Sequence, residues 1–238
     1  DSHIVALYDN VIAAIPVLRP LSGDHPRIDV TKYSNPIDKL VGEKLNKLGI
    51  TPSAICSDTE FLRRVSIDLT GTLPSPDEVL AFIADQAADK RIRKIDELLE
   101  RPSYAAWWAN KLCDFTGCNP TSISSLLEVA REDGYVKATR WYDWIYEKIT
   151  SNRPYVELVE GIMLADLSRG SGGGMPYFWT RQSLEEPNDT AMSVAHSFLG
   201  IQLQCAECHK HPFEQWTQND FEELSNIFYS HMLNTGRK

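Results

Sequence analysis

Two cysteines and one histidine with a close, fixed spacing carry the clearest chemistry in this sequence. They form the pentapeptide Cys205-Ala206-Glu207-Cys208-His209, a pattern typical of c-type haem attachment. Two cysteines three positions apart lie along one side of a helical turn, so both sulfurs reach the two vinyl groups of one porphyrin edge. The histidine that follows then presents an imidazole nitrogen to the iron. The spacing predicts one covalent haem c, with His209 as the proximal iron ligand.

Two other uses of the cysteine pair are possible. A four-coordinate zinc site would recruit Cys205 and Cys208 together with two further ligands, for which Cys113 and Cys118 are available. That site would leave the adjacent His209 without a role. A redox dithiol of the thioredoxin type would follow a strand, and no strand is predicted ahead of the pair. The haem interpretation is favoured because it uses all three residues.

The second axial position on the iron has several candidate ligands. Cys113 is one, because Cys56, Cys113 and Cys118 remain beside the haem pair, and an odd number leaves at least one thiol over. A thiolate on iron is one use for that thiol. A disulfide between Cys113 and Cys118, or a buried and inert Cys113, is the alternative.

Two residues ahead of the motif are further candidates for this distal position. Met192 and His196 lie four apart and share one face of the predicted helix that leads into the motif. For both, ordinary packing within the protein is the alternative. His211 follows His209 by two positions and would point away from the same helix face, so we expect it to have a structural role. The distal ligand therefore stays open among Cys113, His196, Met192 and none.

The net charge of −9 argues against nucleic acid as a partner, because nucleic-acid binding needs basic stripes that neutralise phosphates. The basic run Lys90–Lys94 is followed by Asp96, Glu97 and Glu100, which favours a solvated helix face with ion pairs. No run of about 18 apolar residues is present, so no membrane span is predicted in this segment. Because c-type haem is attached outside the cytoplasm, we expect a periplasmic or cell-surface location.

The motif must be positioned by a mainly helical fold. Helix starts are predicted at Asn35-Pro36, at the capping box of Ser57 and Glu60, and at Ser75-Pro76. Apolar residues at spacings of three and four predict the later helices. Those later helices cover residues 92–99, 103–115, 135–150, 154–167, 188–203 and 216–231. Residues 35–238 are expected to form one helical domain that encloses the haem.

The first 34 residues have a different character. They contain Pro16, Pro20 and Pro26 and show no clean helical period. No strong alternation of apolar and polar residues indicates a strand either. Residues 1–34 are therefore predicted to form an extended N-terminal arm that precedes the helical cytochrome c-like domain.

Longer stretches around these motifs resemble the planctomycete cytochrome-like domain family. The resemblance is strongest from Phe198 to Phe221, which contains the pentapeptide, and it extends upstream through 35–38, 61–71, 73–79 and 107–117. It leaves residues 1–34 outside. The resemblance implies a haem c-motif domain of a large cell-envelope protein, with further domains in the same full-length chain.

Taken together, these features predict a c-type cytochrome domain, and they favour an electron-transfer module over an enzyme in its own right, a choice that the sequence leaves open. Its redox partner protein is not named by the sequence. The alternative function is a haem-based module for small-molecule binding or catalysis, in which a labile distal ligand leaves the iron open. Reduced haem with an open position binds carbon monoxide, so the optical spectrum with and without this gas separates the two functions.

Overall fold

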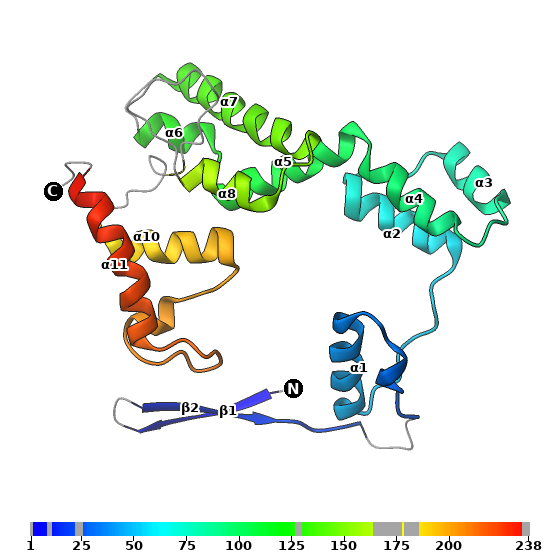
Figure 1. The fold of residues 1–238 in the computed structure, drawn as a ribbon, viewed down its shortest axis with the longest axis horizontal. Coiled ribbons are helices and arrows are strands. Elements are labelled where there is room, and N and C mark those ends of the chain that lie inside the picture. Colours follow the sequence, from blue (N-terminus) through cyan, green and yellow to red (C-terminus); the bar gives the residue numbers. More distant parts are fainter. Residues whose placement is uncertain are drawn as a thin grey trace. The chain divides into compact units, whose positions relative to one another are not determined.

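The structure is a computed structural model that describes residues 2–8, 11–21, 26–126, 130–163, 178 and 186–234. These residues are mainly helical, and the described part contains one two-stranded sheet (Figure 1). The chain divides into two compact units. Unit 1 comprises Asp1–Ile55 with Gln202–Ile227, and unit 2 comprises Cys56–Ile201 with Phe228–Lys238. The mainly helical class is confirmed, whereas enclosure of a haem stays a prediction.

This division differs from the predicted boundary between residues 34 and 35. Helix α1 (Pro36–Leu48) lies just beyond that boundary, yet it belongs with the N-terminal residues in unit 1. The pentapeptide also belongs to unit 1. The reason is local, since a side chain of α1 binds the preceding loop. The Asn46 side chain accepts a hydrogen bond from the Ile28 N–H at 2.8 Å and donates one to the Ile28 carbonyl at 2.9 Å.

Four helices with well-defined starts open unit 2. They are α2 (Asp58–Thr70), α3 (Pro76–Ala84), α4 (Lys90–Leu99) and α5 (Pro102–Thr116). The predicted capping box of Ser57 and Glu60 is present, and the helix start predicted at Ser75-Pro76 also has one, between Ser75 and Glu78. These boxes satisfy backbone N–H groups that the first turn of a helix leaves without partners. The contacts of α2 with α3, α4 and α5 then assemble this part of the unit.

The later helices of unit 2 include the long helix α7 (Arg131–Thr150). The others are α6 (Pro120–Leu126), α8 (Tyr155–Met163) and α10 (Pro187–Val194). Helix α7 contacts both α5 and α6, and its Trp141 and Ile145 are fully buried. Helix α6 is not predicted by the sequence. The helix predicted over 154–167 is confirmed up to residue 163, and residues 164–167 lie outside the described part.

The helix predicted over 188–203 ends earlier than expected. After α10 a π-helical turn covers Ala195–Leu199, and Gly200 closes it with a φ of 66°. The wide turn is closed by a hydrogen bond from the Gly200 N–H to the Ala195 carbonyl, and the Ile201 N–H donates to the same carbonyl at 3.1 Å. A left-handed residue ends a helix because L side chains disfavour that conformation, which glycine adopts freely.

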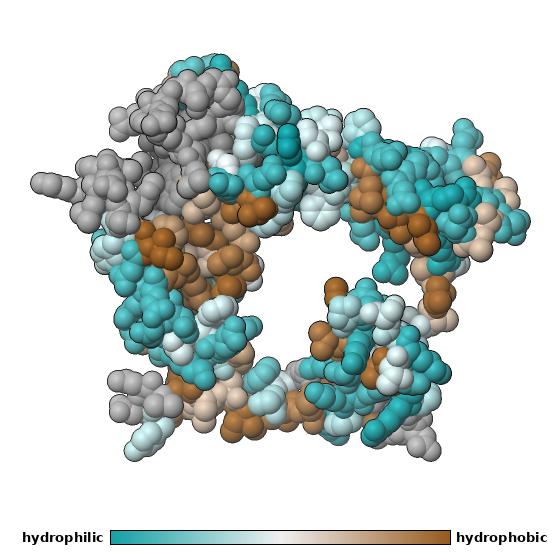
Figure 2. All heavy atoms as spheres, in the orientation of Figure 1, coloured by the Kyte–Doolittle hydropathy of each residue, from teal (hydrophilic) through white to brown (hydrophobic). Residues whose placement is uncertain are grey.

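The N-terminal arm of unit 1, which is predicted to be extended, contains a β-hairpin that the sequence does not predict. Strand β1 (Ser2–Tyr8) pairs antiparallel with β2 (Val11–Val17), and His3 lies opposite Pro16. The hairpin escapes prediction because apolar side chains occupy both of its faces, so the chain shows no alternation. Large exposed side chains include Ile4, Leu7 and Ile15, and brown spheres mark such residues in Figure 2. Pro16 is tolerated because each strand of a two-stranded sheet is an edge strand.

Candidate functional site

The pentapeptide forms a tight turn in unit 1. A 3-10 helix covers Gln204–Glu207, and Cys208 follows it, with its N–H bound to the Cys205 carbonyl. The His209 N–H lies 3.3 Å from the same carbonyl oxygen. The carbonyl of Cys205 therefore accepts from both Cys208 and His209, which fixes the backbone of the three predicted site residues. The structure brings Cys205, Cys208 and His209 together on one turn.

Two buried residues in and beside the motif anchor the turn that carries the cysteines. Ala206 is fully buried and Leu203 is 4% exposed, whereas Cys205 and Cys208 are both exposed. The turn is thus anchored through its small and apolar residues. Both sulfurs are accessible from outside unit 1, as the attachment of a large ring to both of them requires.

The imidazole of His209 is oriented by the backbone next to it. Its Nδ1 lies 2.8 Å from the carbonyl oxygen of Lys210. A carbonyl only accepts, so Nδ1 must carry the proton and donate it. This tautomer leaves the lone pair on Nε2, the nitrogen that a metal would bind. The sequence does not predict this hydrogen bond, because its acceptor is a backbone carbonyl that any residue type at position 210 would supply.

His211 holds the loop that follows the motif. Its Nδ1 accepts hydrogen bonds from the N–H groups of Phe213 (3.3 Å) and Glu214 (3.0 Å). Its own N–H donates to the Trp216 carbonyl at 2.8 Å. These bonds agree with the structural role expected for His211. The hairpin also contacts this loop, because the His3 ring packs edge-on against the Phe213 ring with centroids 5.0 Å apart. The sequence does not predict this contact.

Cys113, the predicted distal ligand, lies in the last turn of α5 in unit 2 and is 7% exposed. Its thiol is hydrogen-bonded to that of Cys118, and this bond, with burial and the charge of Asp114, raises the pKa of Cys113. Cys118 in turn places its sulfur 3.2 Å from the Ala138 carbonyl on α7. All five cysteines lie in the described part, and none forms a disulfide.

The other two distal candidates also belong to unit 2. Met192, on α10, is half-buried, and His196, in the π-helical turn, is exposed. The motif lies in unit 1. The assignment of the distal ligand to Cys113, Met192 or His196 stays a prediction.

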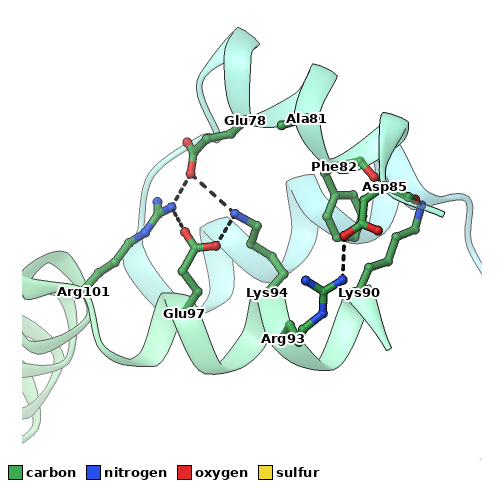
Figure 3. A pocket seen from close by; sticks show the side chains of 9 residues that line it. All are labelled: Glu78, Ala81, Phe82, Asp85, Lys90, Arg93, Lys94, Glu97 and Arg101. Carbon is green, nitrogen blue, oxygen red and sulfur yellow. Dashed lines mark hydrogen bonds and ion pairs between the residues drawn. The ribbon is translucent and has the colours of Figure 1, made fainter. Parts of the chain in front are cut away.

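A hollow of about 380 Å³ in unit 2 is lined mostly by charged residues of α3 and α4 and by Arg101, the residue just before α5 (Figure 3). Arg101 binds both Glu78 and Glu97, and Lys94 lies 2.6 Å from Glu97 and 3.8 Å from Glu78. The bond from Arg101, with that from the Ser75 N–H, lowers the pKa of Glu78 to about 2. These opposite charges are paired with one another, so we interpret the lining of the hollow as an ion-pair network that joins α3 to α4 and to the residue that precedes α5.

No group of three or more metal-binding side chains occurs within the part of the chain that the structure describes. Among the described helices, none is long and apolar enough to cross a bilayer. The expectation of no membrane span in this segment agrees with the second finding.

The model of one protein family, PSCyt2, described as a protein of unknown function (DUF1549), matches residues 36–232. The chain belongs to this family. No curated protein and no solved structure matches it. The resemblance to a cytochrome-like family with a CxxCH haem domain is therefore corrected, because the PSCyt2 description gives no indication of such a domain.

Proposed function

We propose that this PSCyt2 domain binds one haem c covalently and carries single electrons. Cys205 and Cys208 would form the two thioethers, and the Nε2 of His209 would bind the iron. The proposal depends on the residues of the site and not on the family. The observation that carries it is the turn on which two exposed thiols and an oriented imidazole lie together.

The chain's own residues supply what covalent attachment requires. Each cysteine would add its S–H across one vinyl double bond of the haem, with the sulfur bonding to one carbon and the hydrogen passing to the other, so the addition would need no oxidant. Both thiols are accessible for this addition. The buried Ala206 and Leu203 hold the turn in place while the two bonds form. A bound haem supplies one-electron chemistry at iron.

Two parts of the sequence prediction have different support. A location outside the cytoplasm follows from the proposed haem attachment and is proposed with it. Membership of a larger cell-envelope protein with further domains depended on the resemblance that is corrected above, and it stays a prediction. A labile distal ligand, which would allow small-molecule binding, is the alternative function.

Intact mass tests the proposal on protein produced together with a c-type haem maturation system. The mass should exceed the polypeptide mass by one haem after extraction with acid and acetone. The double variant Cys205→Ala/Cys208→Ala should carry no covalent haem. The matched control is Cys56→Ala, since Cys56 is a cysteine of unit 2 outside the motif, and this variant should keep the haem. Extractable haem, or zinc in its place, overturns the proposal.

A further inference from the structure

The end of helix α5 brings two cysteine side chains together. Gly117 ends the helix with a φ of 69°, and the Cys118 N–H then donates to the Cys113 carbonyl at 2.8 Å. This bond spans five residues and is the 6→1 bond of a Schellman-type helix end. In such an end the side chains at these two positions frequently contact each other. Here both positions are cysteines, and their thiols are hydrogen-bonded.

The two thiols differ in their surroundings. Cys113 is 7% exposed, whereas Cys118 is half-buried and therefore the more accessible of the two. The Cys118 sulfur donates to the Ala138 carbonyl of α7 at 3.2 Å. That bond needs the thiol hydrogen, which a disulfide lacks. Formation of a disulfide between Cys113 and Cys118 would therefore replace the hydrogen bond that joins the segment after α5 to α7 with a covalent ring across the end of α5.

We infer that Cys113 and Cys118 are a reversible redox dithiol, with Cys118 as the attacking thiol and Cys113 as the resolving thiol. Its substrates are small or protein disulfides, which serve as the oxidant. The inference is independent of the haem proposal, because it depends on the geometry of unit 2 alone. In its oxidised form the pair would withdraw Cys113 from any role as an iron ligand.

The reaction balances in two exchange steps. The Cys118 thiolate attacks the disulfide R–S–S–R, which gives a mixed disulfide at Cys118 and releases one R–S⁻. The Cys113 thiolate then attacks the Cys118 sulfur, the bond between the protein and R breaks, and the second R–S⁻ leaves. Two electrons pass from the protein thiols to the oxidant, and the two thiol protons go to the released thiolates. Reduction by two equivalents of R–SH reverses both steps.

The test uses the full chain in buffers of graded ratios of reduced to oxidised glutathione. After quenching in acid, the protein is denatured, alkylated and digested with trypsin. Cys113 and Cys118 fall on one tryptic peptide, residues 112–131, which is separate from the peptide of the haem motif. A failure of haem attachment is therefore recognised independently.

The expected result is a single transition of the peptide 112–131. In reducing buffers the peptide should carry two alkyl groups. In oxidising buffers it should take a form with neither alkyl groups nor glutathione, and its mass should be two hydrogens below that of the reduced, unalkylated peptide. Cys118→Ser should abolish this form, whereas the control Cys56→Ser should leave the transition unchanged. The inference is overturned if both thiols remain alkylated in a buffer that oxidises Cys56. It is equally overturned if glutathione stays attached to Cys118 without resolution by Cys113.

Discussion

The Nδ1 atom of His209 donates to the carbonyl oxygen of Lys210 at 2.8 Å. The two residues are adjacent in the chain, so this bond restricts rotation of the imidazole ring and selects the tautomer that is protonated on Nδ1. Histidines that bind metals commonly donate their second nitrogen to a carbonyl or a carboxylate in this way. Within this chain the acceptor belongs to the backbone, so substitution of the Lys210 side chain leaves it in place.

The change His209→Ala should leave the haem attached but remove its native low-spin spectrum, because the two thioethers do not involve the imidazole. Optical spectra of the oxidised and reduced protein measure this. The control Lys210→Ala keeps the carbonyl acceptor and should retain the low-spin bands. An unchanged spectrum in His209→Ala contradicts the assignment of the proximal ligand.

The change Cys113→Ala tests the predicted distal ligand. A thiolate stabilises ferric iron relative to ferrous iron, so its loss should raise the reduction potential and open the reduced iron to carbon monoxide. Potentiometry and the spectrum under carbon monoxide measure the two effects. Cys118 and burial raise the pKa of the Cys113 thiol, so binding to iron would have to displace a proton that the protein otherwise retains.

Two matched variants complete that experiment. Met192→Ala and His196→Ala should change the potential and the spectrum little if Cys113 is the ligand. If Cys113→Ala keeps the native spectrum while His196→Ala becomes high-spin, His196 is the ligand and the assignment of Cys113 is wrong.

Local signals in the sequence predict much of this fold, and side-chain surroundings explain where they fail. The starts of α2 and α3 are predicted because a capping box lies within four residues. The β-hairpin is missed because both of its faces are apolar, so a pattern with a period of two never appears. The basic run Lys90–Lys94 is correctly expected to form ion pairs, but the partner of Lys90 is Asp58 at 2.7 Å, which lies on α2 and not on the same helix.

The sequence likewise predicts only part of the candidate site. The spacing of Cys205, Cys208 and His209 is visible in the sequence, and the structure places them on one turn. The contact between Cys113 and Cys118 depends on the left-handed conformation of Gly117, which brings residues five apart together. The sequence raises that contact only as one alternative, a disulfide, and spacing alone does not decide it. A glycine one position before a cysteine near a predicted helix end is the signal that favours the contact.

The change Glu78→Gln should lower the free energy of unfolding at pH 7 by about 1–2 kcal/mol, because it removes a charged partner of Arg101 and Lys94. Arg101 keeps Glu97, which limits the loss. The matched control is Glu60→Gln, in the other capping box, where the glutamate forms its cap with Ser57 and is not bound to Arg101. Urea unfolding of both variants measures the difference.

The stability contributed by Glu78 should also depend on pH. Its pKa falls from an ordinary value of 4.5 to about 2 in the folded protein, so the folded state favours the ionised form. The contribution is then fully present above pH 4.5 and is lost as the pH falls toward 2. Urea unfolding from pH 5 to pH 2 should show a flatter dependence on pH for Glu78→Gln than for the native protein. Parallel curves would show that the pairing of Glu78 with Arg101 is too weak to matter.

The change Gly71→Ala should destabilise unit 2 by more than the cost of placing alanine in a left-handed backbone conformation. Gly71 ends α2 with a φ of 69°, and a Cβ built there would lie 2.5 Å from the Trp107 ring of α5. Alanine in this conformation costs about 1–2 kcal/mol, and the displaced ring should add about 1–3 kcal/mol. Gly200→Ala is the matched control, because Gly200 has a φ of 66° and a Cβ there would meet nothing within 4 Å. Thermal unfolding should therefore show a clearly larger loss for Gly71→Ala, and equal losses would mean that Trp107 yields without cost.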